Sequence, residues 1–315
     1  MTRHGAVQTG AVQHGAAQHG AAQAGAIRAG AVQVGGEVLS VKRVGAYHHL
    51  TLIAPGVAER FRPGSFLALA IGGDLSSTLH RRSFSIYRVR ETGAYGATVE
   101  VVFAASDTAS RWLSRLRAGE KLDLVGPLGR PFAMPKEPVP CTLVGGGHGS
   151  APMFALAERL RERGCGVHMV LAAPSEAGLF GALEAKRAAQ SVVVVTEDGS
   201  VGMKGTIGEV LPDLLARTST DVVYAAGPVA MLYAVAAAAE MHGAWSQTAL
   251  EQAMPCGVGV CMACVLPVVG EDGVTRMVRA CTEGPVFRGD RVRWRDIGTV
   301  PADTWGAPAG DGTDE

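Results

Sequence analysis

Four cysteines in the C-terminal third of the chain have the spacing that says most about chemistry. Cys256, Cys261 and Cys264 form a Cys-x4-Cys-x2-Cys loop, and Cys281 follows downstream. This order of thiolates is one that holds a [2Fe–2S] cluster. The spacing therefore predicts an iron–sulfur site that carries single electrons.

Two other interpretations of these cysteines remain open. Structural zinc usually takes two Cys-x2-Cys pairs, and only Cys261 and Cys264 form such a pair here. Two disulfides would suit a secreted chain, but we find no secretion signal ahead of this sequence. Gly257 and Gly259 favour the cluster, because glycine lets the backbone curl around the sulfurs and direct amides at them.

A second candidate site lies in the run Arg-Ser-Phe-Ser that begins at Arg82. On a strand, the arginine and the phenylalanine share one face and the two serines take the other. Arginine suits a diphosphate and an aromatic ring suits a flat cofactor. Thr108 and Ser110, at an expected helix start, could add hydroxyl and amide donors. Taken alone, such a strand is more often an ordinary exposed one.

A third candidate site is the loop Gly-Gly-Gly-His-Gly at residues 145–149, which follows an expected strand and precedes an expected helix. Its amides could hold a diphosphate, although a glycine turn that only packs strand on helix is the alternative. His148 is expected to face solvent, since nothing nearby supplies a partner carboxylate. Gly227-Pro228 forms a similar turn, and residues 172–176 carry no Arg or Lys, which weakly favours NAD over NADP.

The residue pattern around these groups predicts three folded modules. Short β-branched runs between Gly and Pro indicate an antiparallel barrel, with one helix at 109–116 capped by Thr108. From residue 141, strands and helices alternate, which predicts an open, parallel, doubly wound sheet. We expect these parts: 1–36 tail, 37–136 flavin-binding β-barrel, 137–245 nucleotide-binding α/β domain, 246–298 [2Fe–2S] domain, 299–315 loose tail.

Composition narrows the possible partners. The 315 residues carry 29 basic and 29 acidic side chains, so no net field favours nucleic acid or an anionic membrane. The longest apolar stretch, 222–239, is interrupted by Gly227-Pro228 and does not read as a membrane span. Cys141 and Cys165 are expected to be buried thiols, which fits a reducing cytoplasm.

The first 35 residues repeat with a period of five, with glycine at positions 5, 10, 15, 20, 25, 30 and 35. This period matches neither helix nor strand. With almost no large apolar side chain, the segment cannot offset its ordering entropy, so we expect it to be disordered.

Several motifs occur in one order between residues 37 and 293. They are Arg82-Ser-Phe-Ser-Ile86, Gly126-Pro-Leu-Gly129, Gly145-Gly-Gly-His-Gly-Ser-Ala-Pro152, Glu197-Asp-Gly-Ser-Val-Gly-Met-Lys-Gly205, Ala226-Gly-Pro228 and Cys256-Gly-Val-Gly-Val-Cys-Met-Ala-Cys264 through Cys281-Thr-Glu-Gly-Pro-Val-Phe287. In these motifs the chain resembles the electron-transfer subunits of class 1B dihydroorotate dehydrogenases. Those belong to the ferredoxin–NADP reductase superfamily and carry a C-terminal [2Fe–2S] domain. The cluster loop followed by Gly-Pro-Val-Phe is the most specific part.

The resemblance implies which residues hold each cofactor. FAD would lie in the barrel cleft at Arg82, Ser83, Phe84, Ser85, Val101, Val102, Thr108 and Ser110. NAD would lie at Gly145, Gly146, Gly147, Gly149, Gly227 and Pro228, and the cluster on Cys256, Cys261, Cys264 and Cys281. Phe84, Ala226 and His148 depart from the usual residues, which affects contact details and not the cofactor set. We name no catalytic side chain, because hydride transfer needs no acid or base.

The resemblance also implies a function in pyrimidine biosynthesis. Electrons from dihydroorotate, oxidised at FMN on a separate catalytic subunit, would pass through the cluster and FAD to NAD+. One alternative is a reductase subunit of another complex, of sulfhydrogenase or bifurcating ferredoxin–NADP oxidoreductase type. Another is a cluster-bearing assembly module that has lost hydride transfer, since His148 and Ala226 alter two nucleotide-facing turns.

Overall fold

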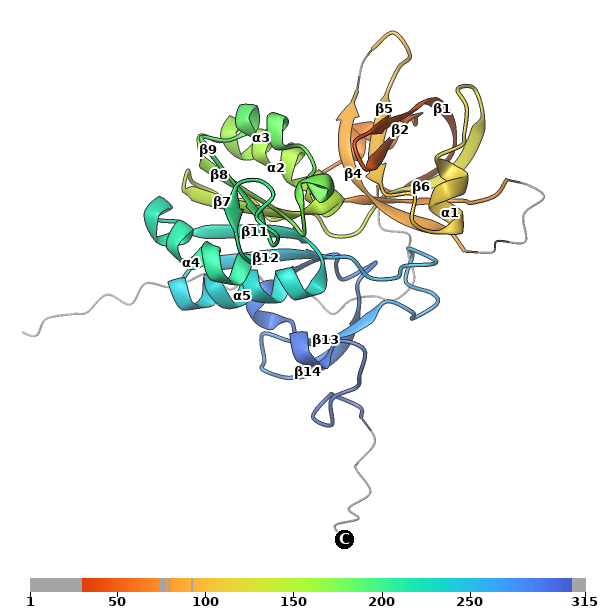
Figure 1. Ribbon diagram of the computed structural model, residues 1–315. Coiled ribbons are helices and arrows are strands. Elements are labelled where there is room, and N and C mark those ends of the chain that lie inside the picture. The colour runs from red at the N-terminus through yellow and green to blue at the C-terminus, as the bar shows by residue number, and fades with distance from the viewer. Residues whose placement is uncertain (1–29, 74–77, 79, 92, 308–315) are drawn as a thin grey trace, which may run out of the picture.

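A computed structural model describes residues 30–73, 78, 80–91 and 93–307. These residues form a β-barrel, an α/β layer and a C-terminal segment that carries the cysteines (Figure 1). In Figure 1 the barrel is orange to yellow, the α/β layer is green to cyan and the cysteine segment is blue. Residues 1–29, most of the five-residue repeat, lie outside the described part of the chain.

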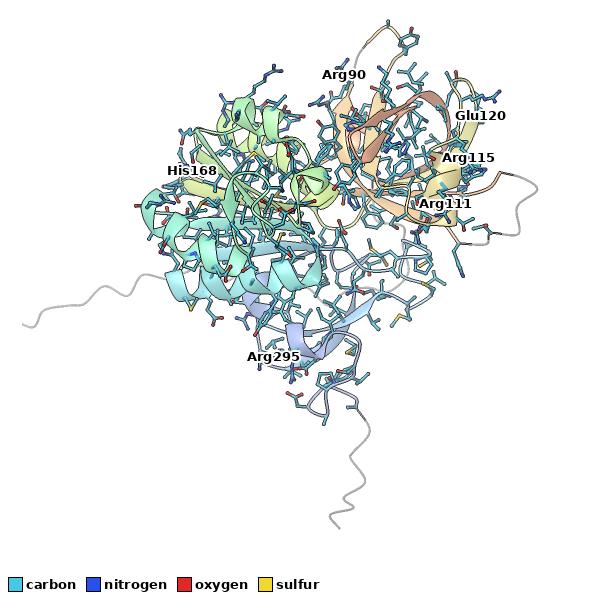
Figure 2. The ribbon with its side chains drawn as sticks, in the orientation of Figure 1. Arg90, Arg111, Arg115, Glu120, His168 and Arg295 are labelled. Atoms are coloured by element: carbon cyan, nitrogen blue, oxygen red, sulfur yellow. The ribbon has the colours of Figure 1, made fainter. Side chains whose placement is uncertain are left out.

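The barrel confirms the predicted antiparallel architecture. Its strands close in the order β1-β2-β5-β4-β3-β6. Their bounds are β1 Val32–Val44, β2 Tyr47–Ile53, β3 Phe66–Leu69, β4 Arg82–Arg90, β5 Thr98–Phe103 and β6 Lys121–Leu128. Alternate residues fill the interior, such as the fully buried Leu50, Leu69 and Ile86. The helix α1 (Thr108–Leu113) lies on the outside, where the exposed Arg111, Arg115 and Glu120 surround it (Figure 2).

The α/β layer is built on a sheet in the order β10-β9-β8-β7-β11-β12-β15. All neighbours are parallel except the edge strand β15, which pairs antiparallel with β12. The strands are β7 Pro140–Gly146, β8 Gly166–Ala173, β9 Ser191–Thr196, β10 Met203–Lys204, β11 Val222–Gly227, β12 Trp245–Leu250 and β15 Val286–Arg288. Strand order reverses between β7 and β11, so the carboxyl ends of these strands form a crevice where ligands bind.

Helices cover both faces of this sheet, as the doubly wound prediction requires. The helices are α2 Ala151–Glu162, α3 Ala182–Ala188, α4 Ile207–Thr218 and α5 Val229–His242. Residues of α2 and α3 share one hydrophobic core, which also receives barrel side chains such as Tyr87. Residues of α4 and α5 share the other core, which continues into the cysteine segment through Leu266. The nucleotide layer is therefore packed against both other modules.

The boundary predicted at residue 245 is displaced by strand pairing. β12 pairs with β11 and β15 pairs with β12, so both strands belong to the α/β sheet. The cysteine segment is an insertion between them, with a hairpin of β13 (Val265–Val269) and β14 (Thr275–Arg279). The connecting loops carry too few apolar residues to form a core of their own. They share the core of α4 and α5.

The C-terminal tail, predicted to be loose, is held on the hairpin around Thr304, while Trp305 next to it is 76 % exposed. Thr304 is 6 % exposed and bridges to Thr275, whose carbonyl accepts a 2.8 Å hydrogen bond from the Trp305 amide. Arg293 forms an ion pair with Asp303. The tail covers an edge of β14, which offsets the ordering entropy expected of a Gly- and Asp-rich sequence.

The tail boundary predicted at residue 36 also shifts. Residues 32–36 form the start of β1 and pair with β6, from Val32 opposite Gly126 to Gly36 opposite Leu122. A Cβ atom at Gly36 would lie 2.7 Å from the Leu124 side chain, so glycine is needed for this close approach. The pairing closes the barrel, and sequence periodicity could not detect a partner so distant in the chain.

Removal of residues 1–36 is expected to destabilise the chain by roughly 3 kcal/mol, at about 0.5–1.5 kcal/mol for each lost backbone hydrogen bond. Removal of residues 1–29 leaves β1 complete and is the matched control, expected to preserve the free energy of unfolding. Urea unfolding of both truncations measures the difference. Equal unfolding midpoints for the two truncations would contradict the role of β1 in closing the barrel.

Candidate cofactor sites

A cleft of about 480 Å³ lies where the barrel meets the α/β layer and the chain after β12. Most residues predicted for FAD line it: Arg82, Ser83, Phe84, Ser85, Val102 and Ser110. Two do not. Val101 is fully buried in the barrel core, and the exposed Thr108 is not among the residues that line the cleft. We call this space the flavin cleft.

Strand β4 places its residues in this cleft through its pairing with β3, where Phe84 lies opposite Leu67. The Phe84 ring packs 5.6 Å from the Phe103 ring, which gives the cleft an aromatic wall. The Ser83 hydroxyl donates a 3.0 Å hydrogen bond to the Met254 carbonyl. This bond joins the barrel to the segment that leads into the cysteine loop.

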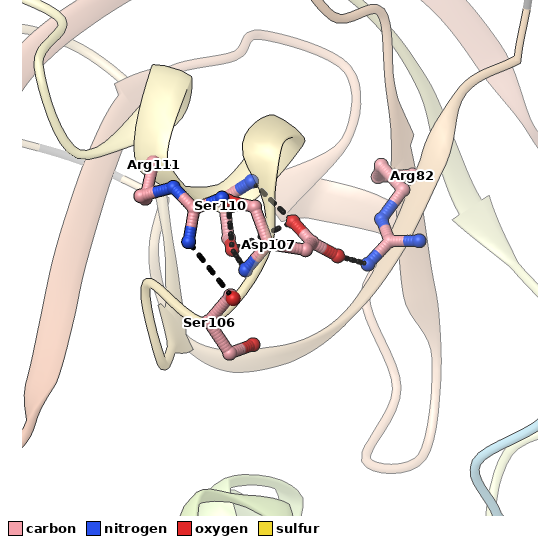
Figure 3. Close-up of polar contacts among 5 residues, drawn as sticks. All are labelled: Arg82, Ser106, Asp107, Ser110 and Arg111. Atoms are coloured by element: carbon pink, nitrogen blue, oxygen red, sulfur yellow. Dashed lines mark hydrogen bonds and ion pairs between the residues drawn. The ribbon is translucent and has the colours of Figure 1, made fainter.

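At one end of the flavin cleft, Arg82 forms an ion pair with Asp107 (Figure 3). Asp107, and not the predicted Thr108, is the N-cap of α1. Its Oδ1 accepts 2.8 Å and 2.7 Å hydrogen bonds from the backbone amide and hydroxyl of Ser110. The Ser110 bonds, and then the Arg82 guanidinium, lower the pKa of Asp107. The carboxylate is therefore ionised at neutral pH.

A second cleft, of about 450 Å³, lies over the carboxyl ends of the parallel strands. Three of the residues that the resemblance assigns to NAD, namely Gly146, Gly147 and Pro228, line it. Gly149 instead serves packing, since a Cβ there would lie 2.8 Å from the Gly227 Cα. A Cβ at Gly145 would likewise lie 2.2 Å from the Ser150 Cβ. These glycines let the two strand-to-helix turns touch at the crevice.

His148 and Glu251 line both clefts and therefore stand where the two clefts meet. His148 was expected to face solvent, but it is half-buried and its ring lies 5.4 Å from the Tyr47 ring. The sequence reasoning missed Glu251. Its signal was its position directly after β12, at the same carboxyl edge as the glycine loops.

Among the described residues that line the second cleft there is no lysine or arginine. Its acidic side chains are Glu197, which follows β9, and Glu251. A carboxylate suits a ribose hydroxyl and repels a 2′-phosphate. This lining agrees with the preference for NAD that residues 172–176 indicated.

The cysteine loop owes its shape to left-handed backbone at Gly257 (φ 69°) and Gly259 (φ 82°). A side chain at Gly257 would meet Ala68 and Leu128, so the loop packs directly on the barrel. Met254, Pro255 and Ala263 of this segment line the flavin cleft. This segment therefore forms part of the wall of the flavin cleft.

The four sulfurs form two pairs. The Cys264 and Cys281 sulfurs lie 3.4 Å apart and share a hydrogen bond. This bond lowers the pKa of Cys264 to about 6 and raises the pKa of Cys281. In the other pair, Cys256 shares a hydrogen bond with Cys261. Burial raises the pKa of Cys256, but backbone amides and Cys261 outweigh it and bring its pKa to about 7.

This pairing fits a two-iron cluster. A [2Fe–2S] cluster places two thiolates on each of two irons, so pairs of sulfurs with amide donors around them are what it needs.

The apolar residues of the loop divide between core and surface. Val258 packs against the core shared with α4 and α5. Val260 is 78 % exposed and Met262 is 51 % exposed.

No helix within the described ranges is long and apolar enough to cross a membrane.

Comparison with known proteins identifies close relatives. Residues 251–293 match the iron–sulfur cluster binding domain of dihydroorotate dehydrogenase B. The electron transfer subunit of dihydroorotate dehydrogenase B (NAD(+)) from Listeria monocytogenes is 35% identical over 233 residues, covering 73% of this chain and 87% of the relative. The Geobacillus thermodenitrificans subunit is 34% identical over 248 residues, covering 78% and 92%.

Solved structures agree with this fold. An NADH-dependent reduced ferredoxin-NADP oxidoreductase described for flavin-based electron bifurcation has a TM-score of 0.72 at 27% identity, covering 84% of this chain and 91% of that one. A ferredoxin NADP+ reductase from Neisseria gonorrhoeae, at 16% identity and a TM-score of 0.54, covers 72% and 96% and shares the fold. With the two clefts and the cysteine loop arranged as described, the chain belongs to the family of dihydroorotate dehydrogenase B electron transfer subunits.

Proposed function

We propose that this chain carries electrons from the oxidation of dihydroorotate, on an FMN-containing catalytic subunit, to NAD+ in pyrimidine biosynthesis. The observation that carries the proposal is the position of the flavin cleft. It shares His148 and Glu251 with the second cleft, and Met254, Pro255 and Ala263 with the cysteine segment. A cofactor bound in the flavin cleft would lie next to both the cysteine segment, where electrons would arrive, and the second cleft, where they would leave.

When bound, FAD and a [2Fe–2S] cluster supply the exchange between two-electron and one-electron transfer. The chain provides binding and orientation. Arg82, Phe84 and Ser110 would hold FAD, and Gly146 and Gly147 would admit NAD close to the sheet edge. The cluster ligands would be Cys256, Cys261, Cys264 and Cys281.

The absence of lysine and arginine from the described lining of the second cleft supports NAD as the nucleotide. The two buried thiols, Cys141 and Cys165, are free, which is the state expected in a reducing compartment such as the cytoplasm. Val260 and Met262, exposed on the cysteine loop, are the surface that we assign to the catalytic subunit.

The experiment has two arms. The purified chain, reconstituted anaerobically, should reduce a dye with NADH, and with a dihydroorotate dehydrogenase catalytic subunit it should reduce NAD+ with dihydroorotate. Absence of the first activity would favour an assembly module without hydride transfer. Absence of the second alone would contradict the proposed partner.

A second candidate function is supported by the likeness to the bifurcating oxidoreductase structure. In that case the electron carrier would be ferredoxin and the partner would not be a dihydroorotate dehydrogenase catalytic subunit. Mass spectrometry of the proteins that co-purify with the tagged chain separates the two candidates.

The Arg82→Ala variant is expected to bind FAD about 10- to 100-fold more weakly, because a charge-assisted hydrogen bond worth roughly 1.5–3 kcal/mol is lost. Arg90→Ala, an exposed position on the same strand that lies outside the flavin cleft, is the matched control. Flavin retained on gel filtration reports the difference. If both variants retained the same amount of flavin, β4 would have a structural role only and Arg82 would not bind FAD.

A further inference from the structure

Asp107 occupies the polar groups that a flavin diphosphate would use. Arg82 and Ser110 both line the flavin cleft, and both bind the same carboxylate. Figure 3 shows the Asp107 side chain between the Arg82 guanidinium and Ser110, while the neighbouring Ser106 accepts a hydrogen bond from Arg111. No other described residue forms an ion pair with Arg82.

The contacts resemble those of a bound anion. A carboxylate and a phosphate both accept hydrogen bonds from a guanidinium and from a hydroxyl. Asp107 uses one oxygen for Arg82 and the other for Ser110, so neither oxygen is free. The side chains of Arg82 and Asp107 are 51 % and 41 % exposed, so the pair sits at the rim of the cleft, where it can open without unfolding the barrel.

We propose that Asp107 acts as an internal competitor for the flavin diphosphate. This inference rests on the proposed function, in which the flavin cleft binds FAD. In this structure the carboxylate holds Arg82 in place. When FAD enters, Arg82 must exchange Asp107 for the diphosphate, and the carboxylate then lies beside a second anion. Asp107 therefore weakens the binding of FAD while it stabilises the chain without FAD.

The test must separate this charge from the N-cap role of Asp107. Asn and Ser both cap helices well and carry no charge, so Asp107→Asn and Asp107→Ser keep the acceptor for Ser110. Two variants guard against a folding defect in either one. Asp272→Asn is the charge control, because Asp272 also pairs with an arginine, Arg276, but on the turn before β14.

The experiment measures dissociation constants of the deflavinated full chain for FAD and for riboflavin, which lacks the diphosphate, by flavin fluorescence. Asp107→Asn and Asp107→Ser are expected to bind FAD about 5- to 10-fold more tightly than the unaltered chain, because FAD no longer has to break the ion pair with Arg82 and no longer meets a like charge. Riboflavin affinity is expected to stay the same, and Asp272→Asn should change neither constant. Without flavin, both Asp107 variants should melt at a lower temperature.

A double variant tests the exchange itself. In an Arg82→Ala background the gain from Asp107→Asn should be smaller than in the unaltered background, because no ion pair with Arg82 has to be broken and only the like-charge contact with the diphosphate remains. If the gain is undiminished in the double variant, or if Asp107→Asn binds FAD no more tightly than the unaltered chain, the inference is wrong. Neither result affects the proposed function. An unaltered chain that binds no FAD overturns the proposed function, and the inference falls with it.

Discussion

Replacement of Cys261 by alanine is expected to abolish dihydroorotate-dependent reduction of NAD+ in the complex while NADH–dye reduction persists. The variant removes one of four thiolates, so the cluster cannot be held and single electrons no longer reach the flavin cleft. We expect the activity to fall by more than about 100-fold. Loss of the ligand itself should cost more activity than loss of a residue that only hydrogen-bonds to a ligand. The visible absorption of the cluster should disappear together with this activity.

Cys165→Ala is the matched control. Cys165 is a free, buried thiol outside the loop, in the core below α2 and α3. Its loss should leave the visible spectrum, the iron content and both activities unchanged. An unaltered visible spectrum in Cys261→Ala, or zinc in place of iron in the unaltered chain, would contradict the cluster assignment.

The Val260→Asp variant is expected to uncouple the chain from its catalytic subunit. Val260 is 78 % exposed on the loop that carries three of the cluster cysteines, so an electron that enters through the loop passes next to it. Placing a carboxylate in an apolar contact should cost about 2 kcal/mol or more, which is at least 30-fold in affinity. Dihydroorotate-dependent NAD+ reduction should fall accordingly, and NADH–dye reduction should not change.

Val44→Asp serves as the control, because Val44 is 56 % exposed at the end of β1 in the barrel hairpin. It introduces the same charge on another module. A Val260→Asp chain that retains its cluster and supports full dihydroorotate-dependent activity would show that electrons enter elsewhere.

Local sequence was sufficient for the motifs and for most elements. The cysteine spacing, the period-two runs of the barrel and the strand–glycine–helix pattern each depend on residues close together in the chain. Helix α5 begins at Val229 and ends at His242, and the residues that bound it, Pro228 and Gly243, are its direct neighbours in the chain. The order of the motifs also indicated the family to which the chain belongs, and the similar proteins confirm it.

What the sequence left undecided depends on contacts between distant residues. Residues 32–36 look like the preceding repeat and become a strand only because β6 offers a partner. Glu251 became a site residue because β12 ends beside β11, where the two clefts meet. Asp107 was missed as the N-cap because the backbone turns at Asp107, one residue earlier than the pattern indicated.

The sequence by itself therefore determined which chemical groups the chain carries and in which order. Only the tertiary structure decided which of them meet. Arg82 and Asp107 are 25 residues apart, and nothing local predicts that the arginine assigned to a phosphate already holds a carboxylate. The physical reason is that the antiparallel pairing of β4 with β5 carries the chain after β5 back beside the start of β4, and the register of this pairing, which shifts between Ile86 and Arg88, decides which residues meet.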